Sequence, residues 1–323
     1  MGLKVASMFA GIGGICSGFK QAGFEVVWAN DSDSAACKTY EHNHPEVCLV
    51  EKDIRSVNID AVPDFDILTA GFPCQPFSVR GKQLGFKDPR GNLFFEIARL
   101  VDIKRPRVIF LENVANLVQH DEGRTFLVIY NSLVQFGYYM KYKVIDAAEY
   151  GNVPQKRERI FIVAFRDYDE CCRFEFPEPT PLTKNVNDIV ERNVKQNESF
   201  YYSSNSFYFD DLKRIVRDEK SIYLIADHGV SQRAYHIAST LKANMGTFAD
   251  RVPIIKDDFG IRKITPRECL GLQGFQSEFN FPSSITLNAA YKQVGNSVCV
   301  PVIFRIAKQI VKACEPLGVV END

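Results

Sequence analysis

A cysteine stands where a nucleophile would be useful. Cys74 follows Pro73 in the run 71–78 (GFPCQPFS), directly after the apolar stretch 66–70. Ligands of open α/β sheets bind at the carboxyl ends of strands, so a thiol at this point belongs to a candidate active site. A buried structural thiol is the alternative, and it is the commoner role of cysteine. The polar, glycine-punctuated segment 78–92 favours the first interpretation, because such a segment can close over a substrate.

A carboxylate and two guanidinium groups follow later in the chain. Glu112 ends the apolar run 107–111, so we expect burial to raise its pKa and let it share a proton with a base. It could instead cap a helix. Arg157 and Arg159 precede the next strand, and we expect one to reach the active crevice while the other holds a phosphate or a structural carboxylate. A solvated run of charges is the alternative.

A glycine-rich turn joins the first expected strand to the first helix. Residues 9–14 (FAGIGG) allow a tight turn and let backbone N–H groups approach a ligand at the positive end of a helix. Cys16 stands where a dinucleotide fingerprint needs glycine. Asp31 ends the second strand and could hold ribose hydroxyls, and Asp53 follows the third strand and could meet an adenine amino group. This pattern favours a nucleoside cofactor without pyrophosphate.

The composition is that of a globular chain without a strong charge signature. Its 323 residues are 46% hydrophobic, enough for two domains, and a net charge of −1 argues against a chain-wide basic surface. No apolar run is long enough to span a membrane, and no signal peptide is evident. The nine cysteines lack metal-ligand spacing, so we expect reduced cytoplasmic thiols and neither zinc nor disulfides.

Strand and helix patterns alternate through the first half of the chain. The expected strands are 4–9, 24–30, 66–70, 107–112, 138–146 and 159–166. The expected helices are 15–22, 34–43, 93–103 and 126–136. Several strands are continuously apolar, which is typical of buried parallel strands. The alternation predicts an α/β fold with a doubly wound sheet; it fades after a proline-rich break at 176–179, and an amphipathic helix is expected at 300–314.

Six segments, in this order, resemble the successive motifs of the bacterial DNA (cytosine-5)-methyltransferase family of the restriction-modification type. They are FAGIGG, GFPCQPFS, ENV, QKRER, the stretch 265–275 (TPRECLGLQGF) and GNSV. The resemblance covers nearly the whole chain outside a variable region near 180–261. It implies a Rossmann-like catalytic domain, residues 1–178 plus 290–323, that binds S-adenosyl-L-methionine. Residues 179–289 would form a smaller target-recognition domain.

The resemblance also assigns the cofactor site. It implies that Asp31 holds the ribose and that Asp53 and Ile54 flank the adenine. Ser32 is a departure, since a number of relatives carry an aromatic residue there that packs on the cofactor. The product would be S-adenosyl-L-homocysteine, and no metal is expected. The implied cofactor-binding residues are Phe9, Gly11, Ile12, Gly13, Gly14, Asp31, Asp53, Ile54, Pro73, Leu93, Asn296 and Ser297.

The implied reaction methylates C5 of a cytosine that has been flipped out of duplex DNA. Addition of the Cys74 thiolate to C6 breaks the aromaticity of the ring and makes C5 nucleophilic. Glu112 is expected to act at N3, and Arg159 to bind O2 and steady Glu112. Arg157 is the fourth residue expected in the catalytic group.

Double-stranded DNA is the partner that the resemblance implies, in a cytoplasmic, nucleoid-associated monomer without membrane contact. A cognate restriction endonuclease is the expected genetic partner. Within the segment 78–92, Arg80 could fill the gap left by the flipped base or grip a phosphate. The candidate DNA-binding residues are Arg80, Lys82, Arg233, Thr240 and Lys242.

Three alternative functions stay open at this point. A tRNA cytosine-5 methyltransferase of the same fold usually carries a Cys-Phe-Thr element, which this sequence lacks. A non-catalytic DNA regulator that binds S-adenosylmethionine would have no use for Cys74, Glu112 and Arg159. The incomplete glycine fingerprint disfavours an NAD-dependent dehydrogenase.

Overall fold

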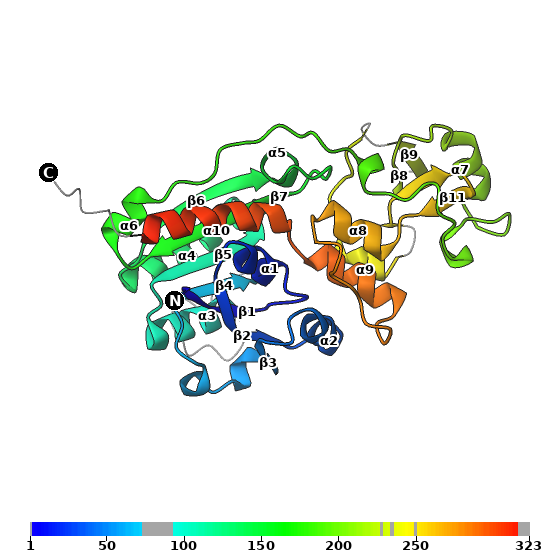
Figure 1. Cartoon of the computed structure of the whole chain (residues 1–323). Coiled ribbons are helices and arrows are strands. Elements are labelled where there is room, and N and C mark those ends of the chain that lie inside the picture. Colours follow the sequence, from blue (N-terminus) through cyan, green and yellow to red (C-terminus); the bar gives the residue numbers. More distant parts are fainter. Residues whose placement is uncertain (1, 73–92, 227–228, 233–235, 249–250, 316–323) are drawn as a thin grey trace, which may run out of the picture.

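Two β-sheets organise the chain and lie in two neighbouring bodies (Figure 1). The computed structural model describes residues 2–72, 93–226, 229–232, 236–248 and 251–315. The strands of the larger sheet are β1 (Lys4–Met8), β2 (Glu25–Asp31), β3 (Cys48–Glu51), β4 (Ile67–Gly71), β5 (Val108–Val114), β6 (Tyr139–Asp146) and β7 (Glu158–Phe165). The helices of this body are α1 (Gly14–Gln21), α2 (Ser34–Asn43), α3 (Leu93–Lys104), α4 (Arg124–Gln135), α5 (Ala147–Gly151), α6 (Tyr168–Arg173) and α10 (Val300–Cys314).

The larger sheet has the strand order β3-β2-β1-β4-β5-β7-β6. Its first five strands are parallel, and the chain leaves β1 toward β2 on one side and continues with β4 on the other. The carboxyl ends of β1 and β4 therefore flank a topological switch point, where open α/β sheets bind their ligands.

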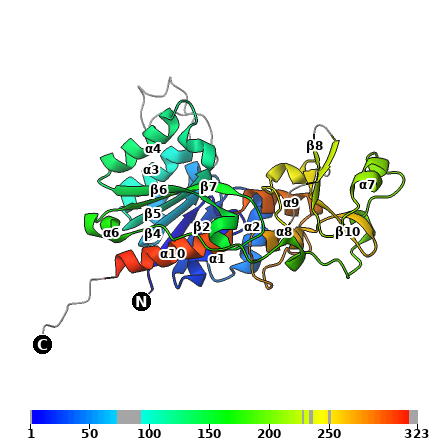
Figure 2. The ribbon, with the colours of Figure 1, turned by 90° about the horizontal axis from the view of Figure 1, so that it is seen from above.

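Apolar residues on these strands serve both faces of the sheet. Along β5, Val108 and Phe110 join one buried cluster, whereas Ile109 and Leu111 join the other. Successive side chains of a strand point to opposite faces, so a strand covered on both sides must be apolar throughout. Figure 2 shows the two layers, with α3 and α4 on one face and α1 and α10 on the other. The predicted doubly wound α/β fold is confirmed.

The expectation of parallel strands is wrong for β7. It is as apolar as β5 but runs antiparallel to it, and β6 in turn runs antiparallel to β7. β6 forms one edge of the sheet, where Tyr139, Tyr142 and Val144 are each a little under half exposed. A continuous apolar run indicates burial on two faces, and it does not report the direction of a strand.

The second body contains an antiparallel sheet of four short strands in the order β11-β10-β8-β9. Figures 1 and 2 place two helices, α8 and α9, between this sheet and the larger one. The helices and strands of the second body are α7 (Phe209–Ile215), β8 (Tyr223–Ala226), β9 (Gly229–Gln232), β10 (Ile254–Asp257), β11 (Gly260–Lys263), α8 (Pro266–Leu272) and α9 (Leu287–Asn296), with the 3-10 helix η8 (Ala243–Gly246). The sequence patterns had left this region irregular.

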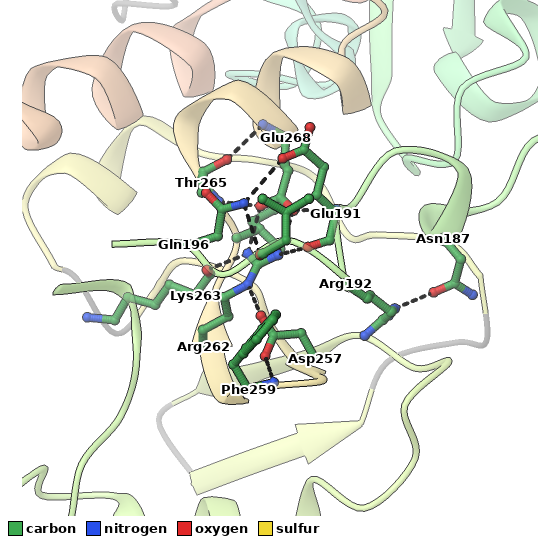
Figure 3. A network of polar contacts seen from close by, with 12 residues as sticks. Asn187, Glu191, Arg192, Gln196, Asp257, Phe259, Arg262, Lys263, Thr265 and Glu268 are labelled. Carbon is green, nitrogen blue, oxygen red and sulfur yellow. Dashed lines mark hydrogen bonds and ion pairs between the residues drawn. The ribbon is translucent and has the colours of Figure 1, made fainter. Parts of the chain in front are cut away.

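A buried charge network holds the second body together (Figure 3). The guanidinium of Arg262 on β11 donates two hydrogen bonds of 2.8 Å to Glu268 on α8, and its Nε donates to Asp257 on β10 at 2.6 Å. It also donates to the carbonyl of Glu191, at 3.0 Å. The side chain of Arg262 is fully buried. One residue thus joins the small sheet, α8 and the segment that leads into the second body.

Candidate active site

A cavity of about 400 Å³ opens at the switch point of the larger sheet. The glycine turn, the ends of β2, β4 and β5, the start of β7 and the end of α9 all contribute to its wall. Among the residues that the sequence singled out, those that line it are Phe9, Gly11, Ile12, Gly14, Asp31, Leu93, Glu112, Arg157, Arg159, Asn296 and Ser297. Strand ends far apart in the sequence therefore converge on one space.

A larger cavity, of about 840 Å³, lies between α5 and the segments 179–182 and 237–239. Its wall includes apolar residues such as Leu182 and Ile237, and its charged residues, Asp146, Glu149 and Lys156, come from the surroundings of α5. Neither the glycine turn 9–14 nor the buried carboxylate of Glu112 lines this larger cavity. We therefore place the candidate active site in the smaller cavity.

The glycine turn is shaped by close approaches of its neighbours. Gly13 has a φ of 88°, and a Cβ added there would stand 2.4 Å from Nε2 of His44. A Cβ on Gly14 would stand 2.6 Å from Oγ of Ser297. A side chain at either position would collide with these atoms. Glycine thus lets α1 begin close to the C-terminal end of α9.

Asp31, at the end of β2, binds the backbone of the glycine turn. Its Oδ2 accepts a 2.8 Å hydrogen bond from the backbone N–H of Gly11, and its Oδ1 accepts one of 2.9 Å from Asp33. Each carboxylate oxygen can accept more than one hydrogen bond. Asp31 therefore keeps acceptor capacity for a hydroxyl in the cavity.

Three of the expected cofactor residues do not line this cavity. Gly13 packs against His44. Asp53 caps a short 3-10 helix and pairs with Arg55, whose hydrogen bonds lower the pKa of the Asp53 carboxyl to about 2. Ile54 is buried in the core under the sheet. Their contacts to a cofactor stay predictions, because none of the three lines the cavity.

Glu112 and Arg159 form an ion pair in the cavity wall. Nε of Arg159, at the start of β7, lies 3.1 Å from Oε1 of Glu112, near the end of β5. Burial raises the pKa of Glu112, and the positive charges of Arg159 and Arg157 act in the opposite direction. A raised pKa favours the protonated form of a carboxyl, which can then donate a hydrogen bond or a proton. The pair is therefore equipped for proton sharing with a bound base.

Asn113 fixes the chain that leads toward the predicted nucleophile. Its side-chain amide donates a 2.7 Å hydrogen bond to the carbonyl of Phe72, and Gly71 pairs with Glu112 across β4 and β5. The end of β4 thus lies beside the Glu112 carboxylate, whose Oε2 would stand 3.4 Å from a Cβ on Gly71. Pro73, Cys74, Arg80, Lys82 and Arg233 lie outside the described residues, and their roles stay predictions.

Arg157 occupies a different environment from the one expected. Its buried guanidinium donates to three backbone carbonyls: those of Leu241 at 2.9 Å, Gly295 at 3.2 Å and Ser297. Burial, followed by the charge of Arg159, lowers the pKa of Arg157 to about 9. The expectation of a phosphate or carboxylate partner is corrected, because the guanidinium bonds are made with carbonyls. Both arginines also line the same cavity, since residues two apart on an extended chain share a side.

The expected DNA-binding residues Thr240 and Lys242 flank the carbonyl that Arg157 holds. Oγ1 of Thr240 donates a 2.7 Å hydrogen bond to the carbonyl of Lys156. A Cβ on Gly295 would stand 2.2 Å from the carbonyl carbon of Lys242, so the end of α9 packs directly on this backbone. The segment is anchored beside the cavity, and its contacts to DNA stay predictions.

Several residues at the site were not assigned by the sequence. The buried side chain of Gln155 donates to the carbonyl of Leu272 at 3.0 Å and accepts from the N–H of Leu241 at 3.1 Å. Asn113 and Gln293 line the cavity, whereas Gln155 is buried outside its lining. The only signal for them was a polar residue next to a strand or helix end, which is equally typical of an ordinary cap.

The described part of the chain shows no group of three His, Cys, Asp or Glu side chains placed to hold a metal ion. Among the described helices, none has the length and apolar character needed to cross a membrane.

Known proteins resemble this chain along nearly its whole length. A family model described as C-5 cytosine-specific DNA methylase matches residues 3–312. Type II methyltransferase M.Bsp6I of Bacillus sp. (strain RFL6) is 47% identical over 315 residues, covering 96% of this chain and 99% of that protein. Type II methyltransferase M.HhaI of Haemophilus parahaemolyticus is 37% identical over 318 residues, with 96% and 94% covered.

Solved structures share the fold at lower sequence identity. A crystal structure of a Spodoptera frugiperda DNMT2 mutant has a TM-score of 0.74 at 22% identity and covers 96% of this chain and 99% of that one. A structure of a putative DNA modification methyltransferase from a prophage of E. coli has a TM-score of 0.69 at 21% identity, with 96% and 99% covered.

Proposed function

Because this chain belongs to the C-5 cytosine-specific DNA methylase family and is a DNA cytosine-5 methyltransferase that uses S-adenosylmethionine, we propose roles for the residues around its cavity. Glu112 and Arg159 hold the target cytosine, and Cys74 attacks it. Asp31, the glycine turn and the end of α9 hold the cofactor. The observation that carries this proposal is that the Glu112–Arg159 pair and the Asp31 carboxylate line one cavity.

The residues present fit a nucleoside cofactor. The cavity volume of about 400 Å³ lies within the usual range for ligand sites. Asp31 offers carboxylate oxygens, and the turn places backbone N–H groups at the start of α1. Oγ of Ser297 is buried and has no hydrogen-bond partner among the described residues. A ligand in the cavity would supply partners for these groups.

The chemistry follows from the Glu112–Arg159 pair. Arg159 donates to O2 of the flipped cytosine, and protonated Glu112 donates to N3. The thiolate of Cys74 then forms a bond to C6, and the electrons of the C5–C6 double bond become available at C5. When bound, S-adenosylmethionine supplies the electrophilic methyl group that C5 accepts. Loss of the C5 proton restores the double bond and releases Cys74 as a thiolate.

Glu112 suits this role because burial raises its pKa and so favours its protonated form. A carboxyl with an ordinary low pKa would be deprotonated at neutral pH and would repel the N3 lone pair. Burial raises the pKa of Glu112, while Arg159 and Arg157 limit the rise. The group can therefore give a proton to N3 and take it back, which is the requirement for a general acid–base.

The domains and partners are also proposals. We assign target recognition to residues 179–289, and DNA contacts to Arg80, Lys82, Arg233, Thr240 and Lys242. The proposed boundary at 290 falls inside α9, so a cut there would divide one helix. The proposed partners are double-stranded DNA and, genetically, a restriction endonuclease. A monomer in the cytoplasm, associated with the nucleoid, completes the proposal.

Transfer of a labelled methyl group tests the proposal directly. The protein is incubated with labelled S-adenosylmethionine and with duplex DNA, tRNA or neither. We expect label on DNA, at C5 of cytosine, and no transfer by Cys74→Ser, which should still bind S-adenosylhomocysteine. Label on tRNA alone would favour the tRNA alternative. Cofactor binding without transfer to either nucleic acid would favour the regulator.

The Asp31→Ala variant tests the cofactor side separately. We expect weaker binding of S-adenosylhomocysteine in calorimetry, because the ribose loses its acceptor and the turn loses the contact between Gly11 and Asp31. Affinity for DNA should change little. Loss of DNA affinity with normal cofactor affinity would contradict the assignment.

A further inference from the structure

A buried hydrogen bond joins two helices that are far apart in the sequence. Oγ1 of Thr39 on α2 lies 2.9 Å from Oε1 of Gln293 on α9, and 254 residues separate the two. Thr39 is fully buried and Gln293 is 5% exposed. The hydroxyl donates and the amide oxygen accepts; this is the shorter of its two contacts with acceptors, the other being the Ala35 carbonyl of its own helix at 3.3 Å. Figure 1 shows α2 on the larger body and α9 beside it, so the bond crosses between the two bodies.

Two further polar contacts flank this bond, one on each side. Lys292 pairs with Asp33 at 2.8 Å, and Asn43 exchanges two hydrogen bonds with the backbone of Asn280. Both contacts are solvent exposed, and exposed polar contacts contribute little. The bond between Thr39 and Gln293 is buried, and a lost partner matters most for a buried polar group.

An apolar contact adds to these polar ones. We call the whole set of contacts, between α2 on one side and α9 with the segment before it on the other, the seam. Ala36, one turn before Thr39 on α2, belongs to the same buried cluster as Tyr291 and Val294 of α9. Positions 33, 36, 39 and 43 follow helical spacing, so they share one face of α2. This face therefore receives α9 and, at its C-terminal end, the segment that precedes α9.

The seam ends at the cofactor cavity. Gln293 itself lines the cavity, and Asn296 and Ser297 follow within about one helical turn. Arg157 holds this end of α9 from another side, through the carbonyls of Gly295 and Ser297. The position of the cavity wall thus depends on contacts made by α9 on two sides.

We propose that Thr39 and Gln293 are positioning residues for the cofactor: their hydrogen bond sets the place of the α9 end and so the reach of Asn296 and Ser297 into the cavity. This inference rests on the proposed cofactor site. Among the described residues, the amide nitrogen of Gln293 has no partner. The Thr39 hydroxyl is therefore the anchor that orients the Gln293 side chain.

Removal of the hydroxyl tests the role of this bond. Thr39→Val keeps the shape of the side chain but leaves the buried Gln293 oxygen without its donor. We expect the dissociation constant for S-adenosylhomocysteine to rise roughly five- to tenfold, the worth of about one hydrogen bond. KM for S-adenosylmethionine should rise similarly, with kcat within about twofold, because neither residue contacts the reacting atoms.

Two variants make the test specific. Thr39→Ser retains a hydroxyl and should restore wild-type affinity. Thr125→Val is the matched control: Thr125 is also buried, and its hydroxyl lies 2.7 Å from Nδ1 of His120, away from the cavity. This control should lower the Tm and leave the affinity for S-adenosylhomocysteine unchanged.

The outcomes separate positioning from stability. A Thr39→Val variant that melts earlier but binds S-adenosylhomocysteine like the wild type would overturn the proposal, as would a Thr39→Ser variant as weak as Thr39→Val. If Thr39→Val does not fold, Gln293→Leu is measured in the same way with the same expectation. Failure of the wild type to bind S-adenosylhomocysteine would overturn the cofactor assignment itself, and this inference with it.

Discussion

Two buried arginine–carboxylate sites in this protein differ in how completely their groups are paired. In the second body, Arg262 meets Asp257 and Glu268, and the oxygens of these two carboxylates also accept from nearby backbone N–H groups and a tyrosine hydroxyl. In the proposed active site, the partner of Glu112 among the described residues is Arg159, with 3.1 Å between Nε and Oε1. Within the described part of the chain, the same residue types thus form a saturated cluster in one place and a sparsely paired one in the other.

The difference appears in the pKa values. Burial acts to lower the pKa of Arg262, but the hydrogen bonds and charges of Glu268 and Asp257 outweigh it, so that pKa is raised and the charge is fixed. Burial raises the pKa of Glu112, and the arginines offset this only in part. A network in which every carboxylate oxygen already accepts hydrogen bonds suits a fixed structure. A carboxyl with fewer partners can still bind a substrate and exchange a proton with it.

The largest expected effect concerns activity at the sparsely paired site. Glu112→Gln should slow methylation roughly 10²–10⁴-fold, the usual contribution of a positioned proton-transfer group. Single-turnover kinetics with saturating DNA measure it. The exposed neighbour Glu158→Gln is the control and should remain near wild type. A near-normal rate for Glu112→Gln would make Glu112 a structural residue like Glu268.

The saturated site should instead affect stability. Arg262→Met leaves two buried carboxylates without their cation, which should lower the free energy of unfolding by about 3–5 kcal/mol. Arg262→Lys keeps the charge but loses the two-pronged contact with Glu268, so an intermediate loss is expected. Urea unfolding measures both. An Arg262→Met variant as stable as the wild type would contradict the claim that the Arg262 site stabilises the fold.

The pH dependence of stability sharpens the comparison further. The pKa of Glu112 is raised in the folded protein, so its contribution to stability is fully present below its ordinary value of 4.5 and is lost as the pH rises through the folded-state pKa. Wild type should therefore lose stability relative to Glu112→Gln as the pH rises above 4.5. Parallel unfolding curves for the two proteins, taken across pH 4–8, would contradict the raised pKa.

An exposed ion pair provides the smallest effect. Glu219 pairs with Lys256, next to Asp257 on β10, at 2.7 Å, but its side chain is 63% exposed. Solvent and salt screen such a pair. Glu219→Ala should leave urea unfolding indistinguishable from wild type. A loss comparable to that of Arg262→Met would show that pairing, and not burial, decides the energetics.

The same contrast explains which parts of the fold the sequence predicts. The larger sheet is held by apolar runs with helices between them, so periodicity locates its strands. The second body uses four-residue strands and places Arg262, Asp257 and Glu268 in its interior. Hydropathy assigns such residues to the surface. Short strands with a charged core therefore appear irregular until their partners are known.

The candidate site was predictable where a side chain follows directly from a strand end. Asp31, Glu112 and Arg159 line the cavity for this reason. Asp53 also follows a strand, yet Arg55, two residues later, captures its carboxylate. Position along the chain does not fix which local partner a side chain takes. Arg157 likewise depends on carbonyls more than eighty residues away, which no local pattern reveals.

The wall of the cofactor cavity has a consequence for synthesis of the chain. One part of it comes from residues 9–15 and another from residues 292–298. During translation the early strands emerge first and begin to fold as a unit, but the cavity still lacks its last wall. The second body, up to the first turn of α9, is made in between. If the proposed cofactor site is right, we expect a growing chain to reach its full affinity for the methyl donor only after its proposed DNA-reading part has been synthesised.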